Sequence, residues 1–171
     1  MLLIVVPEAE SAIQTETEHY MHDMVTANGI SLDQFIAAGN LNNKISMKNT
    51  FGNVALQGVD SSYAYIVSGS DGMMLCHPEG EKVGQPVENA MIKKVVEDIQ
   101  MGSRPETSVV EYKYKGTAKM AAYYVTKKEP TILVITADKD DILAPINNMI
   151  KTGVVAFAIV VVIFAFLAAF I

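Results

Sequence analysis

The stretch from Tyr63 to Asn89 constrains the fold of this 171-residue chain most, because it alternates strand formers with turn formers at close spacing. Residues Tyr63–Val67 are aromatic or β-branched except for Ala64, and Met73–Cys76 form a second apolar run. The Ser-Gly-Ser-Asp-Gly sequence between them is typical of a turn. The second run must stop at His77-Pro78, because proline has no N–H for a ladder hydrogen bond. The stretch therefore predicts a β-hairpin followed by a glycine-rich loop.

A helix and three more strands are predicted after the hairpin. Residues Val87–Ile99 repeat apolar side chains at helical spacing, with Pro86 at a suitable start and Gly102 as the stop. Beyond Pro105 the pattern alternates, which predicts strands over 108–115, 118–126 and 131–137. Short turns force neighbouring strands to be antiparallel. The sequence therefore predicts an α+β domain with a five-stranded antiparallel sheet and helices on one sheet face.

The N-terminal third of the chain is helical in its pattern. Residues Glu8–Asn28 carry a narrow apolar stripe, and Gly29 is expected to end that helix. Ser31 can cap a second, short helix that Gly39 closes. A narrow stripe suits either a helix packed on its own domain or a helix paired with a second copy. Residues 40–62 show no periodicity that predicts an element.

The two ends of the chain are apolar. The run from Val154 to Ile171 has no polar or charged side chain and spans roughly 27 Å as a helix, near the hydrocarbon thickness of a bilayer. We expect residues 151–171 to form a transmembrane helix, with a buried core helix as the alternative. Residues 1–6 are either the stub of a first transmembrane helix or an apolar lead into the first helix. Because the apolar run reaches the last residue, we expect the chain to be truncated, with residues 7–150 as its extracellular domain.

Charge and cysteine content exclude several kinds of protein. The formal net charge is −6, which disfavours nucleic acid as a partner. Cys76 is the only cysteine, so the sequence contains neither a disulfide framework nor a thiolate zinc site. His19 and His22 lie one helical turn apart, but no third ligand accompanies them. We therefore predict no metal site and no cofactor.

Strand alternation places several tyrosines on one sheet face. Tyr63 and Tyr65 share a face of the first strand, Tyr112 belongs to the third, and Lys119 and Tyr123 share a face of the fourth. Buried tyrosine hydroxyls and a buried lysine each need a polar partner. A pocket for a small organic acid or an amino-acid-like ligand, anchored by Lys119, satisfies both. The alternative is that these side chains decorate a half-exposed sheet.

Two further residues are candidates for the same site. His77, at the end of the second strand, either lines the pocket or fixes the loop that follows. As a catalytic base it has no evident nucleophile in the sequence. Asp138 is expected to cap the final helix, which continues directly into residues 151–171. The predicted ligand-binding residues are Tyr63, Tyr65, His77, Tyr112, Lys119, Tyr123 and Asp138.

Three segments together resemble a known family: SYAYIVSGSDGMMLCHPEGEKVGQPVENAMI, VVEYKYKGTAKMAAYYV and ILVITADKDDILAPI. They are similar to the extracellular Cache sensory domain of bacterial methyl-accepting chemotaxis proteins, in its single-Cache form. The shared pattern is a strand, an Asp-Gly turn, a strand, His-Pro, Gly-x-Pro-Val-Glu-Asn, a helix and then Glu-Tyr-x-Tyr-x-Gly. The resemblance covers about Ser61 to Ile146.

The resemblance implies a PAS-like sheet with a long N-terminal helix, a homodimer and two transmembrane helices. It implies a chemoreceptor of the cell membrane whose extracellular domain binds a small molecule and signals through its last helix to a cytoplasmic region. The alternatives are the input domain of a histidine kinase or diguanylate cyclase, a membrane-tethered enzyme that uses His77, and a structural module that dimerises. We expect a receptor without enzymatic activity.

Overall fold

The computed structural model describes the backbone of residues 2–169 and the side chains of residues 11–144 and 152–163. Its helices are α1 (Leu2–Ala37), α2 (Lys44–Phe51), the 3₁₀ helix η1 (Gly80–Lys82), α3 (Ala90–Gln100) and α4 (Lys139–Ala169). Its strands are β1 (Tyr63–Ser68), β2 (Met74–Cys76), β3 (Ser108–Tyr114), β4 (Thr117–Val125) and β5 (Thr131–Asp138).

The strands form one antiparallel sheet in the order β2-β1-β5-β4-β3. The central strand β5 pairs with β1 on one side and β4 on the other. The predicted α+β class and the five-stranded antiparallel sheet are thus confirmed. Every strand boundary lies within one residue of the predicted one.

Both faces of the sheet are covered, so the prediction of one covered face is wrong. On one face, α1 and α2 pack through Met21, Val25, Met47 and Phe51, all of which are buried. On the other face, α3 packs through Ile92, Val95 and Val96 against a separate group of strand residues. The physical reason lies in β5, whose first seven residues are apolar or threonine and are all buried, while only its last residue, Asp138, is charged.

The first helix does not end at Gly29, as the sequence predicted, but continues to Ala37. A Cβ atom built on Gly29 would lie 2.3 Å from the ring of Tyr124 on β4. The missing side chain therefore lets α1 lie directly against the sheet. The second predicted helix is the last part of α1, and Ser31 donates to the Ala27 carbonyl within it and caps nothing.

Two helix starts also differ from prediction. The unassigned segment 40–62 contains α2, whose N-cap Asn43 accepts a hydrogen bond from the Ser46 N–H. Helix α3 begins at Ala90 with Asn89 as its N-cap, whereas Pro86 lies in an isolated β-bridge with Met73. Proline at the first helical position is a preference, and the side-chain acceptor of Asn89 outweighs it here.

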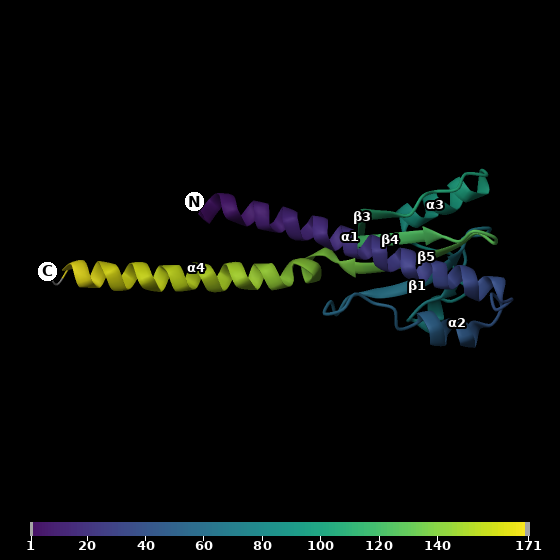
Figure 1. Ribbon diagram of the computed structural model, residues 1–171, viewed down its shortest axis with the longest axis horizontal. Helices are drawn as coiled ribbons and strands as arrows, with labels where there is room; N and C mark the ends of the chain where they lie inside the picture. The colour runs from purple at the N-terminus through teal and green to yellow at the C-terminus, as the bar shows by residue number, and fades with distance from the viewer. Residues whose placement is uncertain (1, 170–171) are drawn as a thin grey trace.

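Helix α4 follows β5 without a linker, as predicted, and extends away from the sheet (Figure 1). The N-terminal part of α1 lies at the same end of the molecule, and α1 contacts α4 (Figure 1). In the part of the chain that the structure describes, no helix combines the length and apolar content of a membrane span. The predicted span runs to Ile171, and the side chains of residues 164–171 lie outside the described residues.

Candidate functional site

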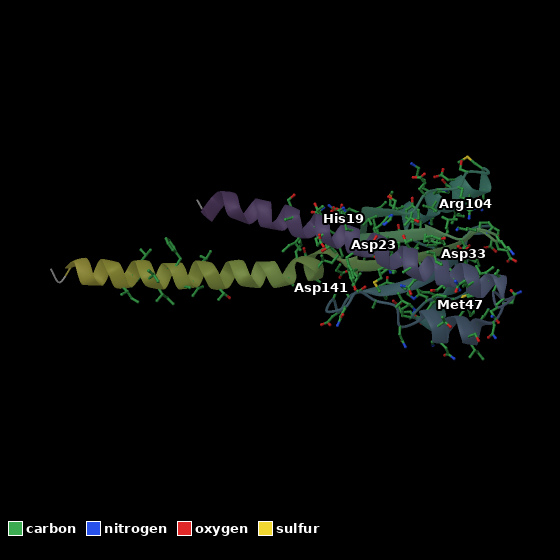
Figure 2. All side chains as sticks on the ribbon, viewed as in Figure 1. His19, Asp23, Asp33, Met47, Arg104 and Asp141 are labelled. Carbon is green, nitrogen blue, oxygen red and sulfur yellow. The ribbon has the colours of Figure 1, made fainter. Side chains whose placement is uncertain are left out.

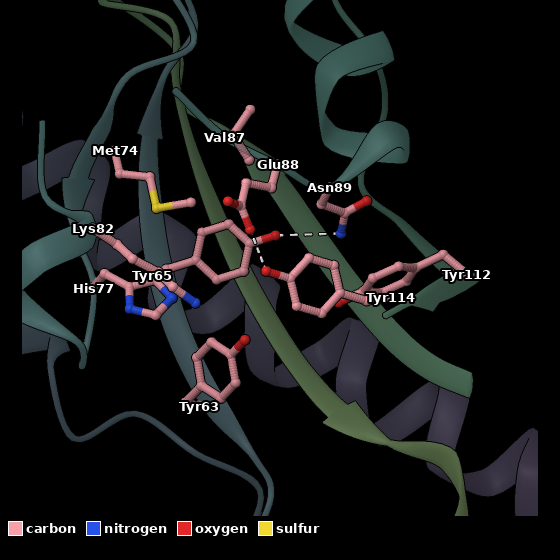
Figure 3. Close-up of a pocket in the computed structure, with 10 residues that line it drawn as sticks. All are labelled: Tyr63, Tyr65, Met74, His77, Lys82, Val87, Glu88, Asn89, Tyr112 and Tyr114. Atoms are coloured by element: carbon pink, nitrogen blue, oxygen red, sulfur yellow. Dashed lines mark hydrogen bonds between the residues drawn. The ribbon is translucent and has the colours of Figure 1, made fainter. Parts of the chain in front are cut away.

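A narrow pocket opens on the face of the sheet that α3 covers only in part (Figure 3). Its floor is formed by β1 and β3, and its outer wall is the segment between β2 and α3. Its free space is about 20 Å³, enough for roughly one water molecule. The residues that line it are Tyr63, Tyr65, Met74, His77, Lys82, Val87, Glu88, Asn89, Tyr112 and Tyr114.

Hydroxyl groups are the main polar feature of this tyrosine pocket. The Tyr65 hydroxyl accepts a hydrogen bond from the Asn89 side-chain amide at 3.4 Å, and the Tyr112 hydroxyl shares one with the Thr136 hydroxyl at 2.9 Å. Burial raises the pKa of Tyr65 and of Tyr112 above the ordinary value, and it raises the pKa of Tyr63 to about 12. The tyrosines therefore stay neutral, and their hydroxyls can donate and accept hydrogen bonds.

His77 forms one side wall of the pocket. It is 4% exposed, and its ring centroid lies 5.3 Å from that of Tyr63 and 5.8 Å from that of Tyr65. Its Nδ1 accepts the backbone N–H of Glu79 at 3.0 Å, which leaves the proton of the neutral ring on Nε2. Burial, and then the charge of Lys82, lowers the pKa of His77. The histidine thus both lines the pocket and fixes the loop that follows it.

The outer wall supplies two charged groups that sequence reasoning did not select. Lys82 pairs with Glu79 at 3.1 Å, and its ammonium lies 6.0 Å from the centroid of the Tyr114 ring. Glu88 accepts a hydrogen bond from the Tyr114 hydroxyl. Glu88 and Asn89 belong to the Gly-x-Pro-Val-Glu-Asn motif, which could have pointed to them. The motif has no strand or helix periodicity, however, so it does not predict in which direction these side chains point.

The structure brings together four of the seven predicted site residues. Tyr63, Tyr65, His77 and Tyr112 line the pocket. The other three do not line it. Lys119 donates to the Asp138 carboxylate and lies 5.8 Å from the centroid of the Tyr63 ring, so this pair borders the pocket. Tyr123 lies on the same sheet face but packs against the core under α3.

Asp138 was predicted to cap the last helix as well as to serve the site. It is the last residue of β5, and α4 begins at the next residue. Its carboxylate pairs with Lys119, while its backbone N–H donates to the Ser61 hydroxyl. Among the described residues, no group of three or more His, Cys, Asp or Glu side chains converges as a metal site would require.

The comparisons with known proteins bear on the fold. No family model and no curated protein matches this sequence. A Cache chemosensory domain, solved to explain its recognition of carboxylic acids, is similar with a TM-score of 0.54 and 14% identity, covering 78% of this chain and 98% of its own. This likeness shows that the chain has the fold of a Cache domain, as the sequence resemblance implied.

Two longer chains are similar over part of their length. One is the extracellular domain of mmHK1S-Z3, assigned as a histidine kinase, with a TM-score of 0.49, 20% identity and 61% of this chain covered. The other is the ligand-binding domain of the amino acid chemoreceptor PctB of Pseudomonas aeruginosa PAO1 in complex with L-Arg, with a TM-score of 0.40, 19% identity and 64% of this chain covered. This chain spans about two fifths of the length of each, 39% and 40%.

Proposed function

We propose that this chain is the sensory part of a transmembrane chemoreceptor, which binds a small organic acid or an amino-acid-like molecule outside the cell. The observation that carries the proposal is the tyrosine pocket, where neutral hydroxyls converge with one lysine and one glutamate on a Cache fold. Aromatic walls with a few polar groups are typical of small-molecule sites. The carboxylic acids recognised by the similar Cache domain support this ligand class.

The signal leaves through α4. The ion pair between Lys119 and Asp138 borders the pocket, and Asp138 is followed directly by the first residue of α4. A shift of β4 against β5 therefore displaces the start of α4, because no linker absorbs the movement. Residues 151–171 are proposed to cross the cell membrane and to connect the sensor to a cytoplasmic signalling region.

A homodimer formed through α1 is part of the proposal. The buried stripe of α1, including Met21 and Val25, packs on its own sheet, so this helix is not free to pair through those residues. Ile13 and Tyr20 lie on another part of α1, at 38% and 48% exposure. Apolar side chains at this seven-residue spacing suit contact with a second copy. Cross-linking of Tyr20→Cys chains tests this arrangement.

A histidine kinase or diguanylate cyclase connected to the same sensor would have the same ligand chemistry, and an assay of kinase or cyclase activity distinguishes these outputs from a chemoreceptor. For an enzyme that uses His77 as its base, Nδ1 is occupied by the Glu79 N–H and Nε2 carries the proton. A hydrolase screen tests that alternative, and activity that is lost in His77→Ala would support it.

Ligand binding is tested on the full chain in detergent by thermal shift against a panel of organic acids and amino acids. A ligand at 100 times its Kd stabilises a protein by about 2.7 kcal/mol. We expect a panel compound whose effect is lost in Tyr65→Phe and in His77→Asn, because both contribute polar atoms to the pocket. Tyr123→Phe is the matched control, since Tyr123 shares the sheet face but does not line the pocket. Stabilisation that survives both pocket variants would contradict the proposed site.

A further inference from the structure

A second cavity lies directly outside the tyrosine pocket. It has about 210 Å³ of free space and is lined by residues 82, 85–88 and 93 together with Met74. Four residues line both cavities: Met74, Lys82, Val87 and Glu88. The two spaces therefore share these side chains as a common wall, and the outer cavity, which we name the cleft, is about ten times larger than the inner pocket. A movement of this wall would open the tyrosines to a ligand larger than water.

Glu88 is the acidic residue of this wall. Its carboxylate lies beside hydrogen-bond donors and positive charges that could equally bind the carboxylate of a ligand. It accepts a hydrogen bond from the Tyr114 hydroxyl, and the Tyr65 hydroxyl points toward the same region (Figure 3). The hydrogen bond from Tyr114, and then the charges of Lys115, Lys82 and Lys93, lower the pKa of Glu88. Glu88 thus stays ionised at the mouth of the pocket, where a phenol and three ammonium groups favour a carboxylate.

Building on the proposed sensory function, we propose that Glu88 occupies the carboxylate subsite of this pocket and that a ligand binds by exchanging its own carboxylate for that of Glu88 at the Tyr114 hydroxyl. The exchange swings an exposed side chain out of the wall and joins the pocket to the cleft. The ligand's carboxylate then lies near Lys82, and its apolar part lies against the tyrosine rings, Met74 and Val87. Glu88 is therefore an internal competitor that sets the affinity of the receptor for carboxylates.

If Glu88 competes with the ligand, its removal should increase the affinity of the chain for a carboxylate. Propanoate binding to the full chain, measured by calorimetry, is expected to be about tenfold tighter in Glu88→Ala than in the unaltered chain, since one charge-assisted hydrogen bond no longer competes. Tyr114→Phe is expected to weaken binding about tenfold, because the donor is lost. Propanamide, which has the same shape without the charge, should show no gain in Glu88→Ala.

Glu81→Ala is the matched control. Glu81 is an exposed carboxylate of η1 in the same outer wall, but it lines neither cavity, so its removal changes the charge equally without emptying the subsite. Weaker propanoate binding in Glu88→Ala, no binding to that variant, or an equal gain in Glu81→Ala would overturn the inference. The sensory function survives those results if another panel compound still binds the unaltered chain through Tyr65 and His77.

Discussion

Lys119 on β4 and Asp138 on β5 stand directly opposite each other in the strand ladder and form an ion pair beside the tyrosine pocket. Their side chains are 11% and 30% exposed, so water screens the pair only in part. The partners come from the strand that borders the pocket and from the residue that precedes α4. The pair therefore connects the proposed ligand site to the helix that leaves the domain.

Removal of one partner is expected to leave the other charge without compensation. We predict that Lys119→Met lowers the free energy of unfolding by about 1–2 kcal/mol, between the values typical of surface pairs and buried pairs. The double variant Lys119→Met/Asp138→Asn should lose less than the sum of the two single losses. Urea unfolding of all four chains measures this coupling. Lys113→Met, an exposed lysine on β3, should have little effect, and strictly additive losses at 119 and 138 would contradict the prediction.

Gly29 is expected to tolerate no side chain. An alanine raises helix propensity by about 1 kcal/mol, but its Cβ would lie 2.3 Å from the buried ring of Tyr124. Because overpacking costs about 1–3 kcal/mol and the propensity gain offsets about 1 kcal/mol of that, Gly29→Ala should lower the free energy of unfolding by up to about 2 kcal/mol. In a Tyr124→Ala background the same change should instead stabilise the chain. A loss of equal size in both backgrounds, measured by thermal unfolding, would show that the ring contact is not the cause.

Protonation of His77 is expected to destabilise the domain as the pH falls. The unfolded chain takes up a proton near the ordinary pKa of 6.5, whereas burial keeps the folded ring neutral to lower pH. The contribution of His77 is therefore fully present above pH 6.5 and is lost as the pH falls toward the folded pKa. A charged ring would also give up its Nδ1 as acceptor for the Glu79 N–H and would lie beside the Lys82 ammonium, against the neutral rings of Tyr63 and Tyr65.

This pH dependence is measured as the melting temperature between pH 8 and pH 5. We expect His77→Asn, whose side-chain oxygen can replace Nδ1 as an acceptor, to show a shallower fall than the unaltered chain. His19 serves as the control, because it is an exposed residue of α1 (Figure 2), and His19→Asn should leave the slope unchanged. An identical slope in His77→Asn would assign the pH dependence to other groups.

Asn89 is expected to have two separable roles. Its side-chain oxygen accepts from the Met91 and Ile92 N–H groups at 2.9 and 3.4 Å, and its amide donates to Tyr65. Asn89→Ala should cost about 1–2 kcal/mol, as lost N-caps do. Asn89→Asp keeps a cap and should cost less, but it loses the donor to Tyr65 and places a negative charge in the pocket. Chemical unfolding measures the capping role, and propanoate calorimetry measures the role in the pocket. Equal losses of stability in Asn89→Ala and Asn89→Asp would contradict the assignment of two separate roles.

The end of the molecule that lies away from α4 shows how tertiary contacts organise residues that carried no sequence signal. Asp33 of α1 accepts the Tyr124 hydroxyl at 2.8 Å and the Lys127 backbone N–H at 2.6 Å. Arg104 donates to the Thr126 and Lys127 carbonyls. Figure 2 shows Asp33 and Arg104 at the end of the molecule that lies away from α4. These contacts tie α1 and the segment after α3 to the same β4–β5 turn.

Local pattern alone determined the hairpin, the three later strands, the shared strand face of Tyr63 and Tyr65, and the direct passage from β5 into α4. That Tyr112 lies on the same side of the sheet depends on the pairing of β1, β5, β4 and β3. Strand alternation has a period of two residues, and a short turn involves only a few residues. Both patterns can therefore be recognised in the sequence without knowledge of the tertiary structure. The resemblance to Cache domains added the overall architecture, which the structural likeness confirms.

Only the tertiary structure decided what each polar side chain faces. Gly29 lies inside α1 and does not end it, and its missing side chain makes room for the Tyr124 ring, 95 positions later in the sequence. Lys119 meets Asp138 and not the pocket because strand register, set across β4 and β5, places them opposite each other. Lys82 and Glu88 reach the tyrosines because the outer wall folds back over β1 and β3, and such a segment has no period from which its side-chain directions follow.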